Sequence, residues 1–174
     1  MDRGDLTDIR PCRAADVPLL DRHLPAPGAP TRHADRFARQ ETGAGAYLVA
    51  WRDGVPVGHG QLRRDGCAAP EVRAAVDDCP EFNGLHVRAD LRGLGIGTAL
   101  IRAAEERSLA RGHAFLGLGV GHDNPRAAAL YARLGYTPVV EYTDRWSRTD
   151  AAGRVHEHAD PCTFLVRRLM APDG

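Results

Sequence analysis

Lysine is absent from the 174 residues of this chain, and all 23 of its basic residues are arginine. Without lysine there is no Schiff-base nucleophile, and a Walker A loop, which needs Gly-Lys-Ser or Gly-Lys-Thr, is excluded. The 23 acidic residues balance the arginines, so the formal net charge is zero and no basic tail favours nucleic acid. We therefore expect neither P-loop nucleotide hydrolysis nor a nucleic-acid partner.

Cysteine is scarce and scattered. Cys12, Cys67, Cys79 and Cys162 lie too far apart for a Cys-x-x-Cys pair, so the sequence indicates neither a zinc knuckle nor a thioredoxin-like motif. No apolar stretch approaches the length that spans a bilayer, and the acidic first residues are not typical of a signal peptide. We expect free thiols, no membrane association and a cytoplasmic location.

The remaining composition is that of an ordinary globular chain, with 43% hydrophobic and 26% charged residues and no internal repeat. Apolar patterning, turn residues and breakers predict strands and helices in alternation. The expected strands cover 6–12, 47–51, 55–62, 81–88, 114–120, 136–142 and 163–169, and the expected helices cover 16–24, 31–41, 97–110 and 125–134. Residues 63–80 are expected to form a long irregular loop, and 150–153 a hairpin tip. This order predicts an α/β fold, a mixed sheet with helices on its faces.

One glycine-rich stretch stands between an expected strand and an expected helix: Arg92-Gly93-Leu94-Gly95-Ile96-Gly97. Strand, glycine turn and helix is the arrangement that aims backbone N–H groups at an anion, with the positive end of the helix dipole behind them. Glycine lets the backbone approach phosphate oxygens closely because it has no Cβ. The stretch predicts a site for the pyrophosphate of a nucleotide-like cofactor.

The dinucleotide-binding fingerprint does not fit this stretch. The fingerprint Gly-x-Gly-x-x-Gly/Ala requires glycine or alanine in its sixth position. That position is Thr98 if the fingerprint starts at Gly93, and Leu100 if it starts at Gly95. A third motif, Arg/Gln-x-x-Gly-x-Gly/Ala, is matched completely by Arg92 to Gly97.

With this match the chain resembles the GCN5-related N-acetyltransferase (GNAT) family. The resemblance covers nearly the whole chain. It includes the opening residues 9–16, the hairpin with Gly54 and Val57-Gly58, and the segment from Asn124 to Tyr136. It implies a single GNAT domain over 1–174, with a central mixed, mostly antiparallel sheet. That sheet would be splayed between two parallel central strands, 81–88 and 114–120, with helices on both faces.

The resemblance also implies acetyl-CoA as cosubstrate and no metal. On matching positions, backbone groups of the glycine turn would cradle the pyrophosphate, and two strand residues would pair with the pantetheine arm. The residues implied to bind the cosubstrate are Leu85, Val87, Arg92, Gly93, Leu94, Gly95, Ile96, Gly97, Thr98 and Asn124.

The implied reaction moves an acetyl group to a primary amine of a small molecule or peptide by direct attack. Tyr131 would be the general acid for the departing thiolate. Glu81 would be the base acting through water, with a solvated charge at a strand end as the competing interpretation. Two alternatives stay open: a non-catalytic acyl-CoA-binding regulatory domain, and an acyltransferase that uses another acyl chain or a hydroxyl acceptor.

The C-terminal part of the chain carries the remaining candidates. His156-Glu157-His158 with Asp160 resembles a metal-binding pattern, but two ligands and a nearby acid do not close a site, so a solvent-facing hairpin is the preferred interpretation. Trp146, among charged residues, is a candidate for an exposed cleft wall or a homodimer contact. Acceptor specificity is expected from 16–41, 63–80 and 143–160.

Overall fold

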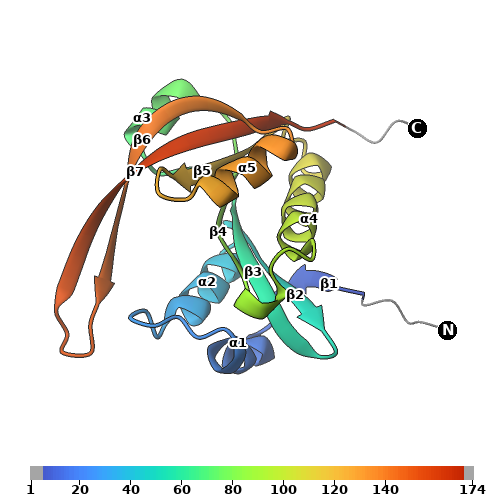
Figure 1. Cartoon of the computed structure of the whole chain (residues 1–174), viewed down its shortest axis with the longest axis vertical. Helices are drawn as coiled ribbons and strands as arrows, with labels where there is room; N and C mark the ends of the chain where they lie inside the picture. The colour runs from blue at the N-terminus through green and yellow to red at the C-terminus, as the bar shows by residue number, and fades with distance from the viewer. Residues whose placement is uncertain (1–5, 171–174) are drawn as a thin grey trace. The chain divides into compact units, whose positions relative to one another are not determined.

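Strands and helices alternate along residues 6–170, the part of the chain that the computed structural model describes (Figure 1). The strands are β1 (Asp8–Pro11), β2 (Gly45–Arg52), β3 (Val55–Arg63), β4 (Glu81–Val87), β5 (Phe115–Gly121), β6 (Thr137–Thr149) and β7 (Val155–Arg168). The helices are α1 (Val17–His23), α2 (Arg32–Glu41), α3 (Pro70–Ala75), α4 (Ile96–Ala110) and α5 (Pro125–Arg133), with 3-10 turns at Ala14–Asp16 and Ala89–Leu91.

The strands hydrogen-bond in the order β1-β2-β3-β4-β5-β7-β6. Strands β1 and β2, β5 and β7, and β6 and β7 pair antiparallel, whereas β4 and β5 are parallel, with Glu81 opposite Gly117. The predicted α/β class and the mixed, mostly antiparallel sheet are confirmed. The prediction that strands 81–88 and 114–120 are parallel to each other is also confirmed.

The chain divides into two units. Unit 1 holds Met1–Leu62 and Gly84–Ala104, and unit 2 holds Arg63–Asn83 and Glu105–Gly174. The division falls inside β3, β4 and α4, so each of these elements contributes residues to both units.

Unit 1 is built on the hairpin of β2 and β3. Asp53 and Gly54 both have positive φ, 49° and 75°, as a two-residue hairpin turn of mirror-image type requires. Residues 46–51 of β2 are all buried, and the face with Tyr47, Val49 and Trp51 packs on α1 and α2. The core cluster on that face contains Cys12, Leu20, Leu24, Tyr47, Val49 and Trp51.

Unit 2 contains a helix that the sequence did not predict. The segment 63–80 was expected to be irregular, and this expectation is wrong for α3, which begins at Pro70. Proline suits the first helical position, where its missing N–H is not needed. The helix is held by Val72, which is buried with Cys67, Tyr142, Cys162 and Phe164. Burial against distant residues, rather than local periodicity, therefore forms this six-residue helix.

Strands β6 and β7 are much longer than predicted. Their pairing continues from Thr143 opposite Pro161 to Thr149 opposite Val155, so both strands extend as far as the hairpin tip that was expected at 150–153. In Figure 1 this distal part leaves the rest of unit 2 as a two-stranded ribbon. Most of its side chains are exposed on both faces, so the sequence lacks the apolar alternation that marks a half-buried strand.

The four cysteines are all free thiols, as predicted. Within residues 6–170, no helix combines the length and apolarity needed to cross a membrane.

A buried carboxylate fastens the C-terminal part of α4 to the sheet of unit 2. Glu105 Oε1 accepts hydrogen bonds from the Tyr136 hydroxyl at 2.8 Å and from Arg167 at 2.8 Å. Arg167 also reaches the second carboxylate oxygen at 2.8 Å. Removing one partner of such a pair leaves the other buried charge without compensation.

We predict that Glu105→Ala lowers the free energy of unfolding by about 3 kcal/mol, because Arg167 and Tyr136 both lose their acceptor. Urea unfolding followed by circular dichroism measures this change. Glu106→Ala, on an exposed position of the same helix, is the control and should change stability by less than about 0.5 kcal/mol. Equal effects of the two substitutions would contradict the assigned role of Glu105.

Candidate active site

The predicted glycine turn forms as expected between β4 and α4. Gly93 and Gly95 have φ values of 81° and 84°, which are strained for other residues, and Ile96 begins the helix. Arg92 to Gly95 are exposed, including the apolar Leu94. A Cβ built on Gly93 or Gly95 meets no atom within 4 Å, so open space lies beside this backbone.

The start of α4 is suited to an anion. The first N–H groups of any helix lack intrahelical acceptors, and the helix dipole adds positive potential there. α4, every residue of which is described, carries no acidic side chain in its first turn. Gly97 and Thr98 lie in that turn. No carboxylate in this first turn therefore competes with a pyrophosphate for the free N–H groups of the helix.

The two predicted pantetheine residues, Leu85 and Val87, lie at the end of β4 and are half-buried. Arg92 folds back from the turn, and its Nε donates to the Val87 carbonyl oxygen at 3.1 Å. The structure thus brings the turn and the strand end together within unit 1. This hydrogen bond from Arg92 uses the Val87 carbonyl oxygen and not the Val87 N–H.

Asn124 and Tyr131 lie two turns apart on one helix, α5, in unit 2. Asn124 is the N-cap, and its Oδ1 accepts from the Ala127 N–H at 3.1 Å. The amide nitrogen of this exposed side chain is the part that could reach a cosubstrate. Tyr131 is buried, with its ring in edge contact with Tyr136, and burial raises the pKa of Tyr131. Its hydroxyl therefore carries a proton at neutral pH.

Glu81 is buried, not solvated, at the start of β4. Burial raises the pKa of Glu81, and Arg63 partly offsets the effect. The amide nitrogen of Asn83 donates to Glu81 Oε2 at 3.3 Å. Asp144, another carboxylate near Glu81, also has a raised pKa, caused by its own partial burial and by Asp160. A carboxylate with a raised pKa is better matched to proton transfer near neutral pH.

Sequence reasoning missed a polar cluster in unit 1. Arg36 of α2 approaches His59 of β3, with its NH1 atom 3.3 Å from His59 Nδ1, and lies over the ring of Tyr47. The signal in the sequence was Gly84, a glycine in the middle of an expected strand. Its φ is 62°, and a Cβ at this position would overlap the Arg36 guanidinium.

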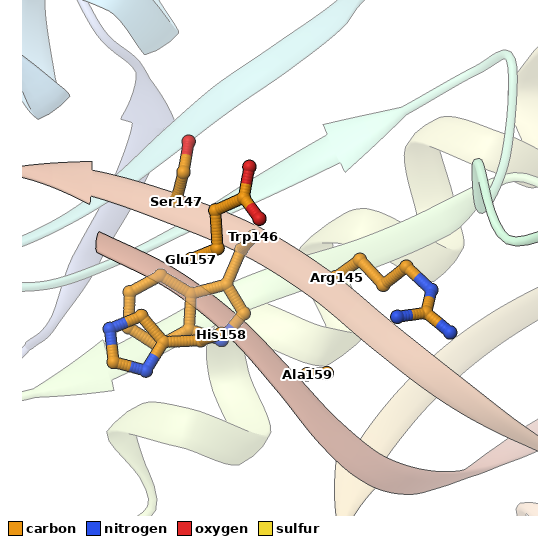
Figure 2. A pocket seen from close by; sticks show the side chains of 6 residues that line it. All are labelled: Arg145, Trp146, Ser147, Glu157, His158 and Ala159. Atoms are coloured by element: carbon orange, nitrogen blue, oxygen red, sulfur yellow. The ribbon is translucent and has the colours of Figure 1, made fainter. Parts of the chain in front are cut away.

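The distal ribbon of β6 and β7 carries a groove of about 380 Å³, lined by Arg145, Trp146, Ser147, Glu157, His158 and Ala159. Figure 2 shows the rings of Trp146 and His158 stacked on each other, and their centres lie 4.1 Å apart. The Trp146 indole N–H donates to Asp160 Oδ2 at 2.6 Å. His156 bonds Asp150 instead, at 2.8 Å. Among residues 6–170, no group of three or more His, Cys, Asp or Glu side chains is placed to hold a metal ion.

The sequence model of the acetyltransferase (GNAT) family matches residues 17–136, more than half of the chain. This chain therefore belongs to the GNAT family, whose members are acyl-CoA-dependent N-acyltransferases that act on amine acceptors. An uncharacterized N-acetyltransferase of Methanocaldococcus jannaschii is 45% identical over 90 residues, 52% of this chain. The matched stretch covers only 38% of that relative's own length.

Solved structures show the same fold. An N-acetyltransferase from Staphylococcus aureus Mu50 aligns with a TM-score of 0.70 at 15% identity, over 95% of this chain and 99% of its own. A second, yncA from Salmonella typhimurium, described as an acetyltransferase with its cofactor acetyl-CoA, aligns with a TM-score of 0.64 at 21% identity. That alignment covers 97% of this chain and 98% of its own.

The buried Glu81 makes a pH-dependent contribution to stability that can be measured. Because its folded-state pKa is raised, that contribution is fully present below the unfolded-state pKa, about 4.3, and is lost as pH rises through the folded-state value. Glu81→Gln cannot ionise. We predict that its stability relative to wild type increases by about 1 kcal/mol or more between pH 4 and pH 8.

Urea unfolding of both proteins at several pH values measures this difference. Glu71→Gln, an exposed position on α3, is the control and should give a nearly constant difference. A difference for Glu81→Gln that stays flat, or falls as pH rises, would contradict the raised pKa.

Proposed function

We propose that this chain transfers an acetyl group from acetyl-CoA to a primary amine of a small molecule or peptide. One observation carries the proposal: the exposed turn at Gly93 and Gly95 opens directly into α4, whose first turn has no acidic residue. Acetyl-CoA supplies an activated thioester, and its pyrophosphate is the kind of anion that a helix start attracts. Membership of the GNAT family supports the same cosubstrate.

The residues present fit acetyl-CoA. In unit 1, the backbone of Arg92 to Thr98 would hold the pyrophosphate, since the space beside Gly93 and Gly95 is open. Leu85 and Val87 would pair with the pantetheine arm as an added strand does. In unit 2, the Asn124 side-chain nitrogen would contact the cosubstrate.

Two residues of unit 2 would move protons. Glu81, through water, would take the proton that the amine loses as the new C–N bond forms. Tyr131 would donate its proton to the sulfur as the C–S bond breaks, because the raised pKa keeps its hydroxyl protonated. The products are the N-acetylated amine and free CoA, and no covalent enzyme intermediate is needed.

Acetyl-CoA binding to the full chain, measured by isothermal titration calorimetry, tests the first step. Gly95→Ala places a Cβ beside the turn at a φ of 84°, so we predict at least tenfold weaker binding. Gly43→Ala is a matched control, because Gly43 has a φ of 81° and equally open surroundings but lies after α2. Both variants should lose similar stability, about 1–2 kcal/mol, and only Gly95→Ala should lose affinity.

Release of free thiol with a panel of primary amines tests the transfer itself. Binding of acetyl-CoA without thiol release for any acceptor would instead support a regulatory acyl-CoA-binding domain. Faster release from a longer acyl-CoA, or with hydroxyl acceptors, would support the corresponding acyltransferase. Failure of acetyl-CoA to bind at all would overturn the proposal.

The assignment of Tyr131 as general acid predicts a specific kinetic change. Tyr131→Phe should lower kcat by about 100-fold, the usual size of a general-acid contribution, and leave the acetyl-CoA affinity unchanged. Stopped-flow or steady-state detection of free CoA gives kcat, and calorimetry gives the affinity.

Tyr136→Phe is the control for this substitution. It removes the neighbouring buried hydroxyl, which bonds Glu105, so it should lower stability by about 1 kcal/mol without changing kcat. Unchanged turnover in Tyr131→Phe, or an equal loss in both variants, would refute the general-acid role.

A further inference from the structure

Arg36 of α2 is positioned by side chains of β2 and β3. One of its terminal nitrogens, NH1, lies 3.3 Å from His59 Nδ1, and its guanidinium carbon lies 5.7 Å from the centre of the Tyr47 ring. The Tyr47 hydroxyl is also a hydrogen-bond partner of the guanidinium. On β4, only glycine at position 84 leaves room for this guanidinium.

The hydrogen-bonding roles in this cluster follow from elementary chemistry. Arginine has only donors, so His59 Nδ1 must accept, and the neutral ring then carries its proton on Nε2. The Leu24 carbonyl, 2.7 Å from His33 Nε2, can only accept. A neutral His33 therefore accepts at Nδ1 from the Tyr47 hydroxyl, 2.6 Å away. The tyrosine oxygen is left to accept from Arg36.

The groups that act on Arg36 do not neutralise it. Within unit 1 they are Tyr47, His59 and Arg32, of which two are neutral acceptors and one is a second cation. Burial and the nearby arginines lower the pKa values of His59 and His86, so these rings are neutral at pH 7. Two hydrogen bonds use part of a fork with five N–H donors, and none of these three groups supplies a negative charge to pair with it.

The guanidinium lies beside the strand that would carry the acyl end of the cosubstrate. Gly84 directly precedes Leu85, and the glycine turn follows the other end of β4. A pantetheine arm that starts at the turn and pairs with Val87 and then Leu85 has its thioester toward Gly84. This step rests on the function proposed above.

We propose that Arg36 binds the carboxylate of the acceptor, so that the acceptor is a free α-amino acid or an amine with a carboxylate at a similar distance. A guanidinium fork matches a carboxylate in a bidentate arrangement. Since Arg36 lies beside the acyl end, the carboxylate and the reacting amine must be close together in the acceptor. A peptide N-terminus, whose carboxylate is distant, does not meet this requirement.

The test compares L-amino acids with their amides, which keep the amine and side chain and lose the anionic carboxylate. Thiol release from acetyl-CoA by the full chain gives kcat/KM for each member of the pairs. For wild type, at least one L-amino acid should exceed its amide by about 100-fold. Arg36→Gln should abolish this preference by lowering kcat/KM for the acid alone, and Arg36→Lys, which keeps a charge without the fork, should be intermediate.

Two controls separate recognition from folding. Arg22→Gln removes an exposed arginine of α1 and should leave the preference unchanged. Acetyl-CoA affinity and the thermal midpoint of Arg36→Lys should stay close to wild type. If Arg36→Gln does not fold, the test rests on Arg36→Lys, whose ratio of kcat/KM for the acid to kcat/KM for the amide should be lower than that of wild type.

Each outcome bears on the inference. Amides or other amines that react as fast as the acids would overturn it while leaving N-acetyl transfer intact. An acid preference that survives in both Arg36 variants would also overturn it. Acetyl-CoA binding without turnover of any amino acid would reject this acceptor class, whereas loss of acetyl-CoA binding itself would reject the proposed function and the inference together.

Discussion

The close approach of α4 to the sheet at Gly58 is the constraint on which the rest of unit 1 depends. A Cβ at this position would lie 2.9 Å from the His86 carbonyl oxygen and 3.3 Å from side-chain atoms of Ile96 and Leu100. Because β3, β4 and the first turns of α4 meet there, the chain must turn back toward the sheet after β4 ends at Val87. The chain makes this reversal over residues 88–95, and positive φ at Gly93 and Gly95 is what permits it. The N–H groups at the start of α4 are thus fixed in place by packing, before any ligand is considered.

The groups of the candidate site differ in charge between the two units. Unit 1 contains the start of α4 and the arginines Arg32, Arg36 and Arg92. It also contains His59 and His86, whose lowered pKa values keep them neutral at pH 7. Unit 2 instead gathers the carboxylates of Glu81 and Asp144, whose pKa values are raised, and the protonated hydroxyl of Tyr131. In the function proposed above, the residues of unit 1 would bind the anionic cosubstrate and those of unit 2 would transfer protons. Acetyl transfer needs both properties, since the cosubstrate is anionic and the attacking amine loses a proton.

What the sequence predicted well was local. The turn at Arg92 to Gly97 depends on spacing within six residues, and the hairpin at Asp53 and Gly54 depends on two. The helix α3 escaped prediction because its one buried anchor, Val72, packs on residues far along the chain. The ribbon of β6 and β7 escaped because strands exposed on both faces carry no apolar alternation. The residues Glu81 and Tyr131 could be singled out by position, but their burial, and hence their raised pKa values, required the folded chain.

The position of Arg36 likewise could not be predicted from the sequence, because it depends on residues far away in the chain, including a glycine that leaves room for it. Nothing within α2 distinguishes this arginine from its neighbours Arg32 and Arg39. Its orientation is set by His59 and Tyr47, and the room for it by Gly84, 48 positions along the chain. A carboxylate supplied by the protein at His59 would neutralise the guanidinium as a structural ion pair. A neutral imidazole at that position orients the fork and leaves its charge in place, so the counter-charge is left for the acceptor to bring.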